Sequence, residues 1–236
     1  MRLLRYDDWV SPVPPVRREV LGVAPEDPVE GRPPVLFVPG PGYRADVFAE
    51  HWLGHTAERG FPAHALTARA GGDLRAYAHD VVQTAAALPR QTVLVGHGVG
   101  AMIVARALGR YPARAAVLVC PVLDRWATIG ARLRAAPVGA VRAVFGGPLR
   151  LSPRQDRPAR IPSPGELARP VGDPPVLVVG SPDDRVVPRK SLDRTAARYG
   201  GAPLLFPGMG HDLVVGEGWA EPIDAILDWL GKELAA

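Results

Sequence analysis

Six short apolar runs divide this chain, and helical patterns fill several of the gaps between them. Continuous apolar runs of this length are typical of strands that are buried on both faces of a parallel sheet. Apolar residues also recur at helical spacing over residues 74–88 and 223–234. The alternation predicts an α/β fold in which helices flank a mostly parallel central sheet. The six runs are residues 35–38, 62–66, 92–95, 115–119, 176–179 and 203–206.

Two stretches depart from this alternation. The chain has 236 residues, which one hydrophobic core can serve, so we expect a single domain over residues 1–236. Residues 1–33 are rich in proline and hold one strand pattern at 19–23, which we expect at a sheet edge. Residues 122–173 are long for a connection and become rich in proline and arginine. We interpret them as a short helical, Pro-rich lid in which Trp126 helps to roof an apolar pocket, with ordinary packing on the sheet as the alternative.

Composition excludes several classes of protein. The net charge is +4, but the basic residues are scattered, so we expect a solvated surface and no nucleic-acid partner. No apolar run approaches the roughly 20 residues that span a membrane, so we expect no membrane partner. Asp7 and Asp8 precede any apolar region, which argues against a secretory signal. A single cysteine, Cys120, excludes a disulfide framework. These features favour a cytoplasmic protein.

Three short motifs follow predicted strands. Gly-His-Gly-Val-Gly occupies residues 96–100, between a strand and a helical pattern. A strand, a glycine-flanked turn and a helix form the context of a nucleophile elbow, G-x-S-x-G. Residues 183–188 read Asp-Asp-Arg-Val-Val-Pro, and residues 208–212 read Gly-Met-Gly-His-Asp. An elbow, an acid and a histidine therefore occur in that order.

In these motifs the sequence resembles the α/β-hydrolase superfamily of esterases, lipases and thioesterases, from Val35 almost to the end of the chain. The resemblance implies that His211 is the catalytic histidine and that Asp184, four residues before Pro188, is its acid, with Asp183 as the fallback. Such an acid holds the imidazole in one tautomer. The resemblance also implies a small-molecule substrate, no metal and no organic cofactor.

The chain departs from the family pattern at the nucleophile. The position of the serine is occupied by Gly98, which has no side chain that could attack a carbonyl, so covalent serine hydrolysis is excluded for this sequence. Cys120 ends a predicted strand close to the expected site, although a small buried apolar residue is its more ordinary role. The serines are all remote from the elbow in sequence: Ser11, Ser152, Ser163, Ser181 and Ser191.

The oxyanion hole is a second departure. One backbone donor, the N–H of Val99, is present, but the other position aligns with Pro41, which has no N–H. Losing one such donor typically costs roughly 100- to 1000-fold in rate. Pro41 lies between Gly40 and Gly42, and the amide of Gly42 could replace the missing donor if the loop is shifted.

Three functional hypotheses follow. In the leading one, His211 and Asp184 carry out non-covalent acid–base chemistry, such as cyclisation, elimination, isomerisation or water activation, on a medium-sized apolar substrate. Gly98 would then leave a small space beside His211 for a substrate group or water. In the second, the protein is a serine esterase or thioesterase whose nucleophile has been replaced by Gly98. In the third, the pocket binds a small ligand or a partner without catalysis.

Two other patterns have weaker interpretations. Residues 40–45 fit the dinucleotide fingerprint G-x-G-x-x-A, and Arg69 could then bind a 2′-phosphate, but the usual acidic residue is missing. His51 and His55 have a spacing compatible with a metal, but no third ligand is evident, so a helix face is the better interpretation. His97, inside the elbow, is expected to pack structurally.

Overall fold

A seven-stranded sheet forms the centre of the protein. The computed structural model describes residues 12–123, 167 and 169–235. The strands lie in the order β1-β3-β2-β4-β5-β6-β7, and all neighbours are parallel except β1, which pairs antiparallel with β3. Their bounds are β1 Val20–Val23, β2 Val35–Val38, β3 Ala63–Leu66, β4 Val93–His97, β5 Ala115–Val119, β6 Val176–Gly180 and β7 Leu204–Leu205.

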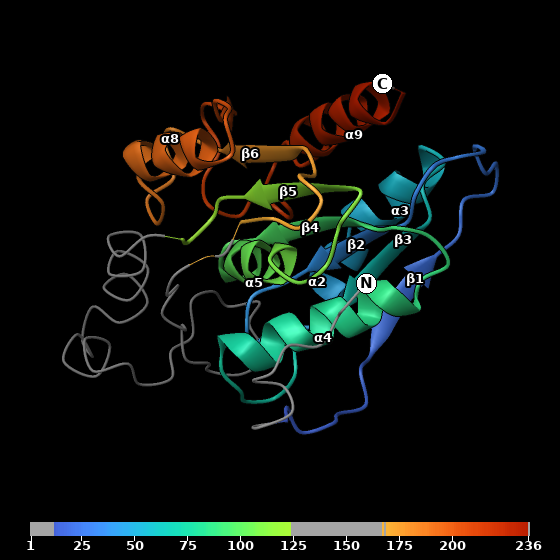
Figure 1. The fold of residues 1–236 in the computed structure, drawn as a ribbon. Coiled ribbons are helices and arrows are strands. Elements are labelled where there is room, and N and C mark those ends of the chain that lie inside the picture. The colour runs from blue at the N-terminus through green and yellow to red at the C-terminus, as the bar shows by residue number, and fades with distance from the viewer. Residues whose placement is uncertain (1–11, 124–166, 168, 236) are drawn as a thin grey trace.

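Helices cover both faces of the sheet (Figure 1). On one face lie α4 (Leu74–Ala87), α5 (Val99–Leu108) and α8 (Arg189–Arg198). The other face is covered by α2 (Asp46–Ala49), α3 (Trp52–Glu58) and α9 (Ala220–Ala235). Among the described residues, no helix combines the length and the apolar character needed to cross a bilayer.

The central strands are apolar throughout because both of their faces are buried. In β2, Val35 and Phe37 pack with α2, α3 and α9, whereas Leu36 and Val38 pack with α4 and α5. Each such side chain stabilises the fold by about 1.5–3 kcal/mol when it is fully buried. This two-sided burial explains why the strands appear in the sequence as continuous runs and not as alternating patterns.

The predicted α/β fold with a mostly parallel sheet is confirmed. The edge strand predicted at 19–23 is present as β1, and β2 and β5 have the predicted bounds. The strand predicted at 203–206 is shorter, since β7 spans two residues between Pro203, which cannot donate a hydrogen bond, and Phe206. No apolar pattern predicts α8, because Leu192 is its one large buried apolar residue.

The predicted lid, residues 122–173, lies almost entirely outside the described residues, and so does Trp126.

Candidate active site

The residues that the sequence singles out lie on neighbouring strands. Gly98 follows β4, Cys120 follows β5, Asp184 follows β6, and His211 follows β7. The carboxyl ends of parallel strands lie along one edge of a sheet, where ligands bind in open α/β folds. The topology therefore brings these four residues to the same edge.

The turn between β4 and α5 requires its flanking glycines. A Cβ atom at Gly96 would lie 2.5 Å from the carbonyl oxygen of Gly100, and a Cβ at Gly100 would lie 2.1 Å from the carbonyl oxygen of Val38. Both contacts are impossible for real side chains. Gly98 itself has φ +58° and ψ −116°, in a region that glycine adopts without strain. The sharp geometry of a nucleophile elbow is present although the nucleophile is not.

Position 98 faces His211. A Cβ atom there would lie 3.2 Å from Nε2 of His211, and, apart from the two chain neighbours of Gly98, no other described residue comes within 4 Å of that point. The distance is shorter than an ordinary van der Waals contact, so the imidazole already takes part of the space that a side chain would use. The space beside His211 is therefore narrower than the glycine at position 98 predicts.

Asp184 holds the other side of the imidazole. Nδ1 of His211 lies 2.8 Å from Oδ2 of Asp184, whose side chain is fully buried, while the His211 side chain is 21% exposed. The amides of Val186 and Val187 donate to Oδ1 of Asp184 over 2.6 and 3.0 Å. Burial favours the neutral acid, but His211 and these two amides outweigh it, so the pKa of Asp184 lies below its usual value. A charged acceptor at Nδ1 keeps the proton there and leaves the lone pair on Nε2, towards Gly98.

The neighbouring aspartate has a different partner. Oδ2 of Asp183 accepts a hydrogen bond of 2.7 Å from the amide of Gly208, in the loop that carries His211. The hydroxyl of Ser181 donates to the carbonyl oxygen of Met209 over 2.6 Å. Asp183 and Ser181 therefore tie the acid loop to the histidine loop, whereas Asp184 contacts the imidazole. This role of Ser181 was not predicted, and no local sequence pattern signals it.

Cys120 lies beside the pair. Its sulfur, a carboxylate oxygen of Asp184 and a ring nitrogen of His211 all lie within 4.8 Å of one another. Burial, together with the negative charge of Asp184, raises the pKa of the Cys120 thiol well above its usual value. A metal would require the thiolate and would have to displace the bond between Asp184 and His211. These residues therefore fit a hydrogen-bonded cluster better than a metal centre.

The loop after β2 explains the proline in the oxyanion region. The amide of Tyr43 donates to the carbonyl oxygen of Gly40 over 3.2 Å, and Gly42 has φ +85°. Pro41 at the second position and glycine at the third are the residues that a type II turn favours. A Cβ at Gly40 would lie 3.5 Å from Cβ of Val99, so the loop touches the start of α5. The Val99 amide has no acceptor within its own helix and remains the backbone donor here, since Pro41 has no N–H.

His97 supports the histidine loop. Its Nε2–H donates to the carbonyl oxygen of His211 over 2.9 Å, and the two rings have centroids 5.1 Å apart. Burial, with a contribution from His211, lowers the pKa of His97. A neutral imidazole suits this contact. His97 was predicted only to pack structurally, and the structure gives it a specific contact across 114 positions of sequence.

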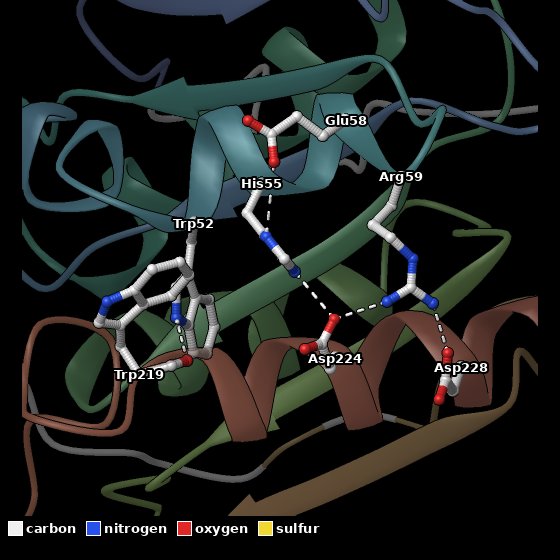
Figure 2. Close-up of polar contacts among 7 residues, drawn as sticks. All are labelled: Trp52, His55, Glu58, Arg59, Trp219, Asp224 and Asp228. Carbon is white, nitrogen blue, oxygen red and sulfur yellow. Dashed lines mark hydrogen bonds and ion pairs between the residues drawn. The ribbon is translucent and has the colours of Figure 1, made fainter.

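The second pair of histidines belongs to the interface between α3 and α9. Figure 2 shows His55 and Arg59 directed at Asp224, with Nε2 of His55 and Nη1 of Arg59 at 2.8 and 2.5 Å from Oδ1. The ring of His51 stacks on Trp219, with centroids 4.4 Å apart. Both histidines therefore have protein partners, which agrees with the helix-face interpretation.

The arginine of the dinucleotide hypothesis is also engaged. Nε and Nη2 of Arg69 donate to the two carboxylate oxygens of Asp80 over 2.5 and 2.6 Å, and both side chains are buried. Arg44, within the glycine-rich stretch, pairs with Glu19 at 2.5 Å. Arg69, in the β3–α4 connection, thus forms a buried ion pair with Asp80 of α4, and nothing in this arrangement favours a phosphate.

Comparison with protein families identifies the group to which the chain is related. The model of the serine hydrolase family matches residues 35–222, which is most of the chain. The chain belongs to the serine hydrolase family. A comparison with curated protein sequences gives no match.

Solved structures of α/β-hydrolases share the fold. Monoacylglycerol lipase from Paleococcus ferrophilus is 14% identical with a TM-score of 0.67, and the match covers 92% of this chain and all of the lipase. Est1E from Butyrivibrio proteoclasticus, with ferulic acid bound, is 16% identical with a TM-score of 0.68, covering 93% and 96%. Proline iminopeptidase from Mycobacterium smegmatis is 12% identical with a TM-score of 0.69, covering 92% and 95%. The fold is therefore the α/β-hydrolase fold, as predicted.

In this member of the serine hydrolase family, position 98 is a glycine. Of the serines, Ser181 bonds to the histidine loop, and Ser191 lies in the first turn of α8, while Ser11, Ser152 and Ser163 lie outside the described residues. The catalytic roles of His211 and Asp184 stay predictions.

Proposed function

We propose that this member of the serine hydrolase family is an enzyme that transfers protons without forming a covalent intermediate. His211 acts as the general acid or base, and Asp184 orients it. One observation carries the proposal: Nε2 of His211 points at the empty position of Gly98 while Nδ1 is bonded to a buried carboxylate. A protein that only binds ligands gains nothing from such an oriented imidazole.

The arrangement supports reactions in which the substrate or a water molecule brings the reacting group. A hydroxyl, an acidic C–H or a water placed near position 98 would meet the lone pair on Nε2 of His211, whose side chain is partly exposed. A positioned general base typically contributes roughly 100- to 10,000-fold in rate. The amide of Val99 would stabilise a negatively charged oxygen that develops next to it. Cyclisation, elimination, isomerisation and water activation on a medium-sized apolar substrate all fit.

A second candidate rests on the elbow. Gly98 keeps the backbone geometry that presents a nucleophile, and a Cβ there would face His211. The same chain with a serine at this position would be a serine esterase or thioesterase, and Gly98 would then be a replaced nucleophile. The Gly98→Ser variant separates the two candidates.

The first experiment compares the wild type with Gly98→Ser on p-nitrophenyl acetate and butyrate and on short acyl thioesters. The control is Gly98→Ser combined with His211→Ala. Strong hydrolysis by Gly98→Ser that depends on His211 would support the replaced-nucleophile candidate. A Gly98→Ser variant that stays inactive would exclude the replaced-nucleophile candidate, because it would mean that the loop with Pro41 has lost the oxyanion hole. Proton transfer and binding without catalysis would then be left, and the next experiment separates them.

A second experiment tests proton transfer directly. The wild type is incubated in D₂O with the acetoacetyl thioester of N-acetylcysteamine, and deuterium incorporation is followed by NMR. We expect incorporation above the buffer rate that His211→Ala abolishes. Incorporation equal in the wild type and in His211→Ala would contradict the proposal and favour a pocket that binds without catalysis.

A further inference from the structure

Cys120 occupies a backbone position that a side chain rarely adopts. Its φ is +45°, a value that glycine reaches without strain and that an L-residue does not. The turn is fastened to the elbow on both sides, because the amide of Gly98 donates to the carbonyl oxygen of Val119 and the amide of Val122 donates to that of Gly98. A glycine would fit this turn more easily, so the strain points to a use for the thiol.

The thiol lies where the carboxylate of Asp184 has room for one more donor. An ionised carboxylate offers about four acceptor sites. Oδ1 of Asp184 takes the amides of Val186 and Val187, and Oδ2 takes Nδ1–H of His211. The sulfur of Cys120, fully buried, lies within 4.8 Å of the carboxylate and of the imidazole. A thiol beside a charged carboxylate in a buried setting stays protonated, so it is a donor.

We propose that Cys120 is a positioning residue whose S–H donates to the carboxylate of Asp184 and so keeps that carboxylate aligned with Nδ1–H of His211. The amide of Cys120 donates to the carbonyl oxygen of Val179 at the end of β6, over 2.8 Å. Cys120 thus joins the elbow on one side to the strand that leads into the acid loop on the other.

This role for Cys120 rests on the proposed function in one respect: aligning His211 is useful only if His211 transfers protons. The hydrogen bond itself exists or not whatever the reaction is. Two further ionisable groups of the described residues lie near the imidazole, His97 and Asp212, and neither changes in the variants below.

The test uses Cys120→Ala and Cys120→Ser. If the sulfur only fills space, alanine is tolerated and the buried hydroxyl of serine is the worse substitution. If the thiol is a donor to Asp184, serine replaces it and alanine does not. The two roles therefore predict opposite orders for the same pair of variants.

The readout is the exchange rate with water of the Nδ1 proton of His211, followed as a low-field line by proton NMR. We expect a slowly exchanging line in the wild type and in Cys120→Ser. In Cys120→Ala we expect exchange at least about tenfold faster, which is the usual weight of one hydrogen bond to a charged group. Thr195→Val is the matched control, because it removes a buried donor that bonds to Ser191 in α8, and it should leave the line unchanged.

Cys120→Gly is a second variant that relieves the backbone strain, and we expect it to exchange as fast as Cys120→Ala. Exchange in Cys120→Ala at the wild-type rate, or exchange in Cys120→Ser as fast as in Cys120→Ala, would overturn the proposal. A wild type without a slowly exchanging line would overturn it too. If instead the proposed function is wrong, the protein would show no turnover, while the Nδ1 proton would still exchange slowly in the wild type and in Cys120→Ser and fast in Cys120→Ala.

Discussion

Two histidine–aspartate pairs in this molecule, His211–Asp184 and His55–Asp224, have equal hydrogen-bond distances but different surroundings. In each pair a ring nitrogen and a carboxylate oxygen are 2.8 Å apart, and each histidine side chain is 21% exposed. The side chain of Asp184 is fully buried, whereas that of Asp224 is 44% exposed. Asp184 also takes two backbone amides, while Asp224 shares its charge with Arg59.

A hydrogen-bonded histidine and aspartate do not by themselves make a candidate site. At the His211 pair, the second ring nitrogen faces an elbow with no side chain. At the His55 pair, the second ring nitrogen lies 3.7 Å from Glu58, so both sides of the ring are occupied by carboxylates (Figure 2). A proton acceptor needs a nitrogen that substrate can reach, and the structure offers one at the His211 pair.

The largest difference that we predict is in stability, between alanine variants of two glycines, one from each region. Gly100→Ala places a Cβ 2.1 Å from the carbonyl oxygen of Val38, so we expect a loss of about 3 kcal/mol in the free energy of unfolding. Gly54→Ala, in α3, meets no atom within 4 Å and should gain about 0.5–1 kcal/mol from helix propensity. Urea denaturation measures both. A Gly100→Ala protein as stable as the wild type would mean that the elbow is not packed against β2.

The next effect compares the two carboxylates. Asp184→Asn weakens a buried acceptor of three donors, so we expect a loss of about 2–3 kcal/mol in the free energy of unfolding. Asp224→Asn acts on an exposed ion pair and should cost less than about 1 kcal/mol.

Deuterium incorporation into the thioester probe should follow the same division. We expect Asp184→Asn to lose on the order of 1000-fold or more, because the imidazole takes the wrong tautomer, and Asp224→Asn to keep the wild-type rate. Equal effects on stability and rate would show that burial does not distinguish the pairs.

A smaller effect is the dependence of stability on pH, which we attribute to His97, the buried histidine beside the His211 pair. The pKa of His97 is lowered in the native state, so the unfolded chain binds more protons below pH 6.5, and stability falls as the pH falls from there. Between pH 7 and 5 we expect the free energy of unfolding of His97→Gln to fall by about 1 kcal/mol less than that of the wild type. Urea denaturation across this range measures it. His64, whose pKa burial also lowers, requires His64→Gln as the control.

Below this pH range, stability depends on the protonation of Asp184. Its pKa is lowered in the native state, so its contribution to stability is complete above the unfolded pKa, near 3.8, and is lost as the pH falls through the native value. The wild type should therefore lose stability more steeply than Asp184→Asn below about pH 4. Parallel curves for the two proteins would contradict this.

The smallest effect is the response to salt. The pKa of Asp224 is lowered by its bond to His55 and by Arg59, and these groups are exposed enough to be screened. Between 0.05 and 1 M NaCl we expect the cost of Asp224→Asn, roughly 0.5 kcal/mol at low salt, to vanish, and the cost of Asp184→Asn to stay constant. A cost of Asp184→Asn that also falls with salt would mean that water reaches that carboxylate.

The sequence predicted the site unevenly. The resemblance to the α/β-hydrolases predicted Asp184 and His211 for the site, and the apolar runs placed both residues after strands, at the sheet edge. The spacing to Pro188 favoured Asp184 over Asp183. Both residues follow β6, and the directions of their side chains show that Asp184 contacts the imidazole while Asp183 accepts from Gly208. The contact of His97 spans 114 positions, and that of Cys120 depends on how β5 and β6 end beside each other.

By itself, the sequence determined the layered α/β architecture and the absence of a nucleophile at position 98. Burial on both faces demands continuous apolar strands, and glycine has no reactive atom under any fold. Three facts came from the tertiary structure: Asp184 contacts His211, a Cβ at position 98 would lie 3.2 Å from Nε2 of His211, and Pro41 lies in a turn. These facts depend on the directions of side chains and amides from separate loops, and local patterns carry no information about how such loops meet.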